Sequence, residues 1–193
     1  MRQKRFFVDG RKAPLTPRQF GHMAADLSLP NARSRVANFL SLPHTDDDTS
    51  LIYQISKQPQ IALGHLMAIS AAAFIAYVEM TIDIPNSQKQ EIGDGLLEGY
   101  TKFFPNTDYI SHLTGIYVAS ILFDIKNGGS VHPAGTETHR TLIKLLSQGY
   151  SGRDEIEDYE GLDSHMLGPF TDNYYLAIIT DIRDFGKLRF AFA

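Results

Sequence analysis

The stretch that decides the fold is residues 59–84, PQIALGHLMAISAAAFIAYVEMTIDI. Large apolar side chains occur all round a helical projection of this stretch, from Ile61 to Met80, and not on one stripe. A helix without a polar face must be covered on every side. We therefore predict a buried central helix over residues 59–84, with the rest of the chain packed around it and with Ile69 and Phe74 fully buried.

The same stretch is long enough to cross a bilayer. It is rich in alanine, carries His65 and Glu79 internally, and lacks a flanking cluster of Lys and Arg. We expect the core helix of a soluble protein and no membrane contact. We expect His65 and Glu79 to be satisfied by hydrogen bonds to another helix, because a buried polar group without a partner is unfavourable. The N-terminus has no apolar run of signal-peptide length, so we expect a cytoplasmic protein.

Composition indicates one folded domain over residues 1–193. The chain is 43% hydrophobic and 21% charged, as is usual for globular domains. It has no cysteine, which excludes disulfides, thiolate metal sites and cysteine nucleophiles. We expect no cofactor.

Periodicity predicts further helices on both sides of the central one. They cover residues 17–27, 32–40, 87–104, 107–126 and 136–146, and Thr16 and Thr136 are placed as helix N-caps. The fourth of these, residues 107–126, shows one apolar side that ends at Ile125. Three glycines inside the predicted helix 87–104 indicate that another backbone approaches it closely: Gly93, Gly95 and Gly99.

Both ends of the chain carry short strand patterns, at residues 4–8 and 187–193, which we expect to pair. Residues 174–182 fit either a helix or a strand. The predicted fold is mainly α: a single-domain bundle of about five to seven helices around residues 59–84, with a small β element from the chain termini.

Charge is distributed unevenly along the chain. Residues 1–40 have a net charge of +6 and the remainder a net charge of −10. Either the basic segment packs on the acidic body of the same molecule, or it binds a polyanion. The candidate polyanion-binding residues are Arg11, Arg18, Arg33 and Arg35.

Residues 16–40 have the outline of a helix-turn-helix, with two short helices about a break at residues 28–31. Residues 23–29, MAADLSL, resemble the centre of that motif, although Ser28 stands where the motif has glycine. An ordinary helical hairpin explains the same pattern.

A metal site of imidazole and carboxylate ligands is a third hypothesis. Five side chains lie near two helix starts: Asp108, His112, His132, Glu137 and His139. The length of helix 107–126 separates the first two from the rest, which leaves a smaller site at His132, Glu137 and His139, or one shared across a subunit interface. These residues do not match a recognised metal-ligand spacing.

No catalytic spacing is visible in the sequence, so binding is favoured over catalysis. We expect a non-enzymatic cytoplasmic protein-interaction or regulatory protein with a protein partner, and an acidic run at residues 153–160 suits a basic one. A nucleic-acid-binding regulator using residues 11–40 is the first alternative. A His/carboxylate metal-dependent enzyme is the second. The sequence leaves open whether the protein forms a homo-oligomer.

Overall fold

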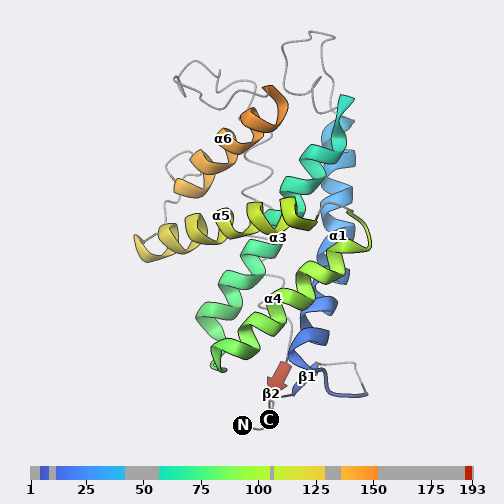
Figure 1. The fold of residues 1–193 in the computed structure, drawn as a ribbon, viewed down its shortest axis with the longest axis vertical. Helices are drawn as coiled ribbons and strands as arrows, with labels where there is room; N and C mark the ends of the chain where they lie inside the picture. Colours follow the sequence, from blue (N-terminus) through green and yellow to red (C-terminus); the bar gives the residue numbers. More distant parts are fainter. Residues whose placement is uncertain are drawn as a thin grey trace.

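The structure is a computed structural model that describes residues 5–8, 12–41, 57–104, 107–128, 136–151 and 190–192. The described elements are β1 (Phe6–Val8), α1 (Pro17–Leu40), α3 (Pro59–Thr81), α4 (Asn86–Thr101), α5 (Thr107–Lys126), α6 (Glu137–Ser151) and β2 (Phe190–Phe192). They form a helical bundle with a small two-stranded sheet at one end (Figure 1), which confirms the predicted fold class. Residues 153–160 and 174–182 lie outside the described residues.

Helix α3 is the centre of the bundle, as predicted from residues 59–84. It contacts each of the other four described helices. Ile69 and Phe74 have no exposed surface, which confirms the prediction for both. Among the described helices, α3 alone is long and apolar enough to cross a membrane, and 78% of its apolar window is buried inside the protein. That burial is what a core helix requires.

Helix α1 corrects the predicted helix-turn-helix. Residues 17–40 form one continuous helix with Pro30 inside it, so the two short helices and the break at residues 28–31 are absent. Pro30 lacks the N–H that would bond the Asp26 carbonyl, but both residues lie on the exposed side of α1. On the opposite side Leu29 and Ala32 are buried in the core. Packing of this side therefore outweighs the local preference for a break.

The start of α1 agrees with its predicted cap. The Gln19 N–H donates to Thr16 Oγ1 at 3.2 Å, and the Thr16 N–H donates to Gln19 Oε1 at 2.9 Å. This reciprocal pair is a capping box, and Pro17 occupies the first helical position, where its missing N–H has no consequence.

Helices α1 and α4 approach each other through glycines. A Cβ atom added at Gly95 would lie 2.1 Å from the Arg18 carbonyl oxygen, and one at Gly21 would lie 2.0 Å from the Ile92 carbonyl oxygen. At Gly99 it would lie 2.4 Å from the Ala25 Cβ. The predicted close approach is thus confirmed at Gly95 and Gly99. It is wrong for Gly93, whose nearest neighbour is the Cδ1 atom of Ile75 at 4.0 Å.

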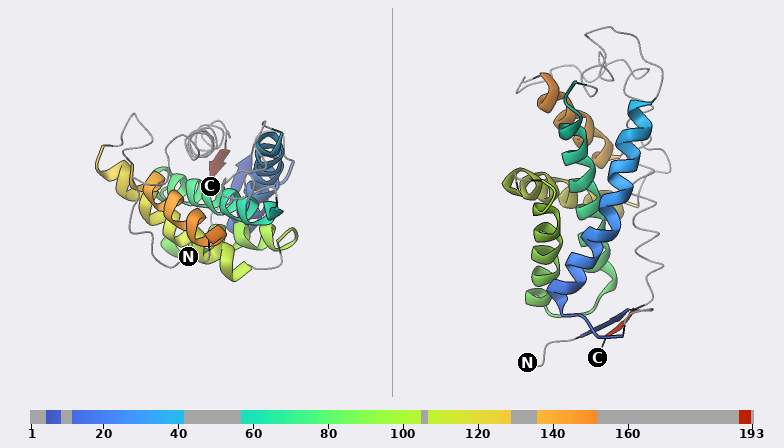
Figure 2. Two further views of the ribbon diagram at one scale, coloured as in Figure 1. Left: turned by 90° about the horizontal axis from the view of Figure 1, so that it is seen from above. Right: turned by 90° about the vertical axis from the view of Figure 1, so that its right-hand side faces the viewer.

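The two ends of the chain meet in the small sheet. Strand β1 pairs with β2 in antiparallel orientation, with Phe7 opposite Ala191. On its other side, Phe6 exchanges two backbone hydrogen bonds with Leu15, at 2.9 and 2.8 Å. Figure 2 shows this sheet beneath the first turn of α1. The predicted pairing of the terminal strands is confirmed.

Candidate functional site

His65 is the ionisable side chain that α3 carries into the core, where it has no exposed surface. Its Nδ1 atom lies 2.8 Å from the hydroxyl of Tyr117, and its Nε2 atom lies 3.2 Å from the hydroxyl of Tyr109, both on α5. The predicted hydrogen bond to another helix is therefore present at both ring nitrogens. Glu79 also has the predicted partner on another helix, because its carboxylate pairs with Lys89 of α4 at 3.0 Å, but unlike His65 it is exposed.

Burial sets the ionisation of this cluster. It lowers the pKa of His65 from 6.5 to about 3, so the imidazole is neutral at physiological pH. Burial also raises the pKa of Tyr109, and burial together with repulsion from the Tyr109 phenolate that forms at high pH raises the pKa of Tyr117 well above its usual value. All three groups are uncharged. We assign the shorter contact to the Tyr117 hydroxyl donating to Nδ1, and the longer one to Nε2–H donating to Tyr109. The cluster joins α3 to α5.

The candidate polyanion-binding arginines that the structure describes lie along α1. The Nη2 atom of Arg18 lies 2.7 Å from the carboxylate of Glu98 on α4, an ion pair within the chain. The guanidinium of Arg33 lies over the ring of Phe103, 5.3 Å from its centroid. Arg35 is half-buried, and Arg11 lies outside the described residues. Basic side chains of residues 1–40 thus contact α4 and the turn after it. This is the arrangement expected if the basic segment packs on the rest of the same molecule.

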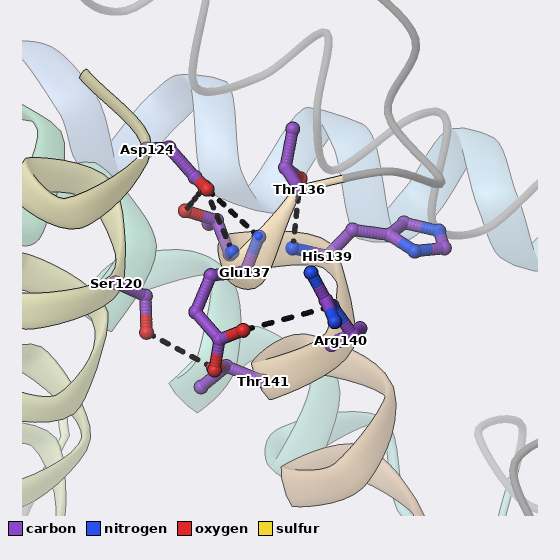
Figure 3. Close-up of polar contacts among 8 residues, drawn as sticks. Ser120, Asp124, Thr136, Glu137, His139, Arg140 and Thr141 are labelled. Carbon is purple, nitrogen blue, oxygen red and sulfur yellow. Dashed lines mark hydrogen bonds and ion pairs between the residues drawn. The ribbon is translucent and has the colours of Figure 1, made fainter. Parts of the chain in front are cut away.

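The junction of α5 with α6 is fixed by one carboxylate (Figure 3). Asp124 accepts the N–H of Glu137 at 2.8 Å, the N–H of Thr138 at 2.9 Å and the hydroxyl of Thr138 at 2.6 Å. The N–H of His139 donates to Thr136 Oγ1 at 3.1 Å, which confirms Thr136 as the N-cap. The negative charge of Asp124 also lies at the positive end of the α6 dipole. These groups cap a helix.

The smaller metal hypothesis rests on His132, Glu137 and His139. The Glu137 carboxylate is paired with Arg140 at 3.6 Å, and the imidazole of His139 extends away from it (Figure 3). His132 lies outside the described residues. Within the part of the chain that the structure describes, no three His, Asp or Glu side chains are grouped closely enough to hold a metal ion.

The remaining predicted ligands, Asp108 and His112, are exposed near the start of α5. Asp124, beside the start of α6, lies sixteen residues further along the same helix. At 1.5 Å per residue this is about 24 Å, so α5 keeps the two halves of the five-residue hypothesis apart.

The side of α5 that faces away from α3 is exposed and carries no charge over most of its length. Residues 109–123 contain no Asp, Glu, Lys or Arg. Phe123 is 55% exposed, and a Cβ atom added at Gly115 would meet nothing within 4 Å. Helix α5 crosses in front of α3 in Figure 1 and lies at the edge of the bundle in Figure 2. We define the outward face of α5 as Asp108, Ser111, His112, Gly115, Ala119, Leu122, Phe123 and Lys126.

Sequence reasoning missed this face. The predicted apolar side of α5 is confirmed for Ile110, Leu113, Tyr117 and Ile121, which are buried, and is wrong for Ile125, which is exposed. The prediction did not consider the opposite side of the helix. The available signal was the long run without charged residues, which is unusual for a helix with one side in solvent.

Comparison of the chain with protein families, curated proteins and solved structures finds no match. The functional argument therefore rests on the geometry of this chain alone.

Proposed function

We propose that this protein is a non-enzymatic protein-interaction module with a regulatory or scaffolding role, and that it binds its partner through the outward face of α5. The observation that supports this proposal is the exposed, uncharged centre of that face, from Gly115 to Phe123. Exposed apolar patches rimmed by polar residues mark interaction surfaces, and here Asp108 and Lys126 form the rim.

The ionisable groups of the described core and junctions favour binding over catalysis. His65 is hydrogen-bonded at both nitrogens, Asp124 caps α6, and Glu98 is paired with Arg18 and lies 3.2 Å from His22. Each of these groups stabilises contact between two helices. Ionisable groups in these positions hold the helices in fixed places, as a scaffold that presents a binding surface requires.

Position-specific photo-crosslinking in the native cell tests this function. A photoreactive phenylalanine analogue replaces Ala119 or Phe123, and, as controls, the exposed residues Asp26 of α1 or Gln90 of α4. We expect one product of defined mass from the two α5 positions and none from the controls. The product must also disappear when Gly115 is replaced by Gln, which adds bulk at the centre of the face. Equal labelling at all four positions, or no product at any of them, would contradict the proposal.

A further inference from the structure

The outward face of α5 is self-complementary. Asp108 and Lys126 lie nine residues on either side of Tyr117, and Gly115 and Ala119 lie two residues on either side of it. An α-helix turns 100° per residue, which places these four residues along one line on the solvent side, opposite the buried Tyr117. The line therefore has opposite charges at its two ends and small residues at its centre.

A two-fold axis converts this arrangement into matched contacts. If α5 of a second copy lies antiparallel with its midpoint at the same position, Asp108 of each copy faces the partner's Lys126. Gly115 then faces the partner's Ala119, and His112 faces the partner's Phe123. Small residues at the centre permit close approach of the two helices, as they do between α1 and α4 within one chain. A parallel pairing would bring like charges together at both ends.

We propose that two copies of this chain associate through the outward face of α5, packed antiparallel about a two-fold axis between Gly115 and Ala119. This inference rests on the proposed function and identifies its partner as a second copy. The line from Asp108 to Lys126 is about 27 Å long, and one helix pair buries less surface than a standard interface. We therefore expect a weak dimer, in the micromolar range or above.

Gly115 provides a clean perturbation. A Cβ atom added there meets nothing within 4 Å, and Gln is the better helix former, so we expect Gly115→Gln to leave the monomer fold intact. At the proposed axis the same side chain separates the two backbones. Sedimentation equilibrium of the full chain, up to several hundred micromolar, measures the effect. We expect the dissociation constant to rise at least about 100-fold relative to wild type.

A charge swap tests the register and the orientation. Asp108→Lys and Lys126→Asp each place two like-charge pairs in the dimer, and each weakens it about tenfold. The double variant restores opposite charges and returns the dissociation constant to near the wild-type value. Both substitutions oppose the dipole of α5, so a gain in helix stability does not explain this rescue. Circular dichroism verifies that every variant is folded.

Three outcomes overturn the dimer. They are a wild-type chain that stays monomeric throughout, a dimer that Gly115→Gln leaves unchanged, and a double variant that is as weak as the single ones. The proposed function is tested separately, because a Gly115-dependent crosslink from Ala119 to a different protein supports that function whether or not the pure chain forms a dimer.

Discussion

Lowering the pH from 7.5 to 5.0 should destabilise this protein through His65. The folded-state pKa of His65 is about 3, against 6.5 for an unperturbed histidine, because burial disfavours the imidazolium. Between these values the unfolded chain binds a proton that the folded chain excludes, so protonation favours unfolding. The contribution of His65 to stability is complete above pH 6.5 and is lost progressively as the pH falls toward 3.

The expected loss follows from the separation of the two pKa values. A pH of 5.0 is 1.5 units below the unfolded-state pKa of 6.5. At 1.36 kcal/mol per unit, the free energy of unfolding falls by about 2 kcal/mol. Because ordinary carboxylates remain ionised at pH 5.0, their protonation does not contribute to unfolding between pH 7.5 and 5.0. Urea unfolding of the full chain at the two pH values measures the difference.

The matched variant is His65→Gln, which keeps a donor and an acceptor for the two tyrosines but does not titrate. The other six histidines are present in both proteins, so their contributions cancel in the comparison. Wild type should lose about 2 kcal/mol more than the variant between pH 7.5 and 5.0. Tyr109→Phe should retain most of this difference, because burial and not the hydroxyl causes the shift. Equal losses in wild type and His65→Gln would refute the reasoning.

Four further substitutions test the packing of the helices. Gly95→Ala should destabilise the protein by about 1–3 kcal/mol, because its Cβ meets the α1 backbone. Gly93→Ala on the same helix should instead stabilise the protein by up to about 1 kcal/mol. Equal effects of the two substitutions in thermal melts would contradict the close approach of α1 and α4. Pro30→Ala should stabilise α1 by about 1–3 kcal/mol in urea titrations, and a loss would indicate that the helix needs its proline. Asp124→Ala should cost about 2 kcal/mol and raise hydrogen exchange in the first turn of α6, and unchanged exchange there would exclude the cap.

Much of the architecture is predictable from the sequence because it depends on composition within one segment. Residues 59–84 are apolar on every side, and such a helix has no stable position except at the centre of a bundle. The strand patterns at the two termini and the caps at Thr16 and Thr136 are local signals of the same kind. Gly95 and Gly99 likewise predicted the close approach of another backbone, although nothing in the sequence indicated that this backbone is α1.

Only the tertiary structure decided the features that depend on which side of a helix its neighbours cover. Pro30 predicts a break by itself, but buried contacts on the opposite side of α1 keep the helix continuous. The tyrosines that meet His65 come from α5, forty-four and fifty-two residues away, a separation that periodicity does not encode. The centre of the outward face of α5 is uncharged in the sequence but becomes a surface only because α3 and α6 pack on other sides of the helix. Segment composition is a local property, whereas burial depends on the whole arrangement.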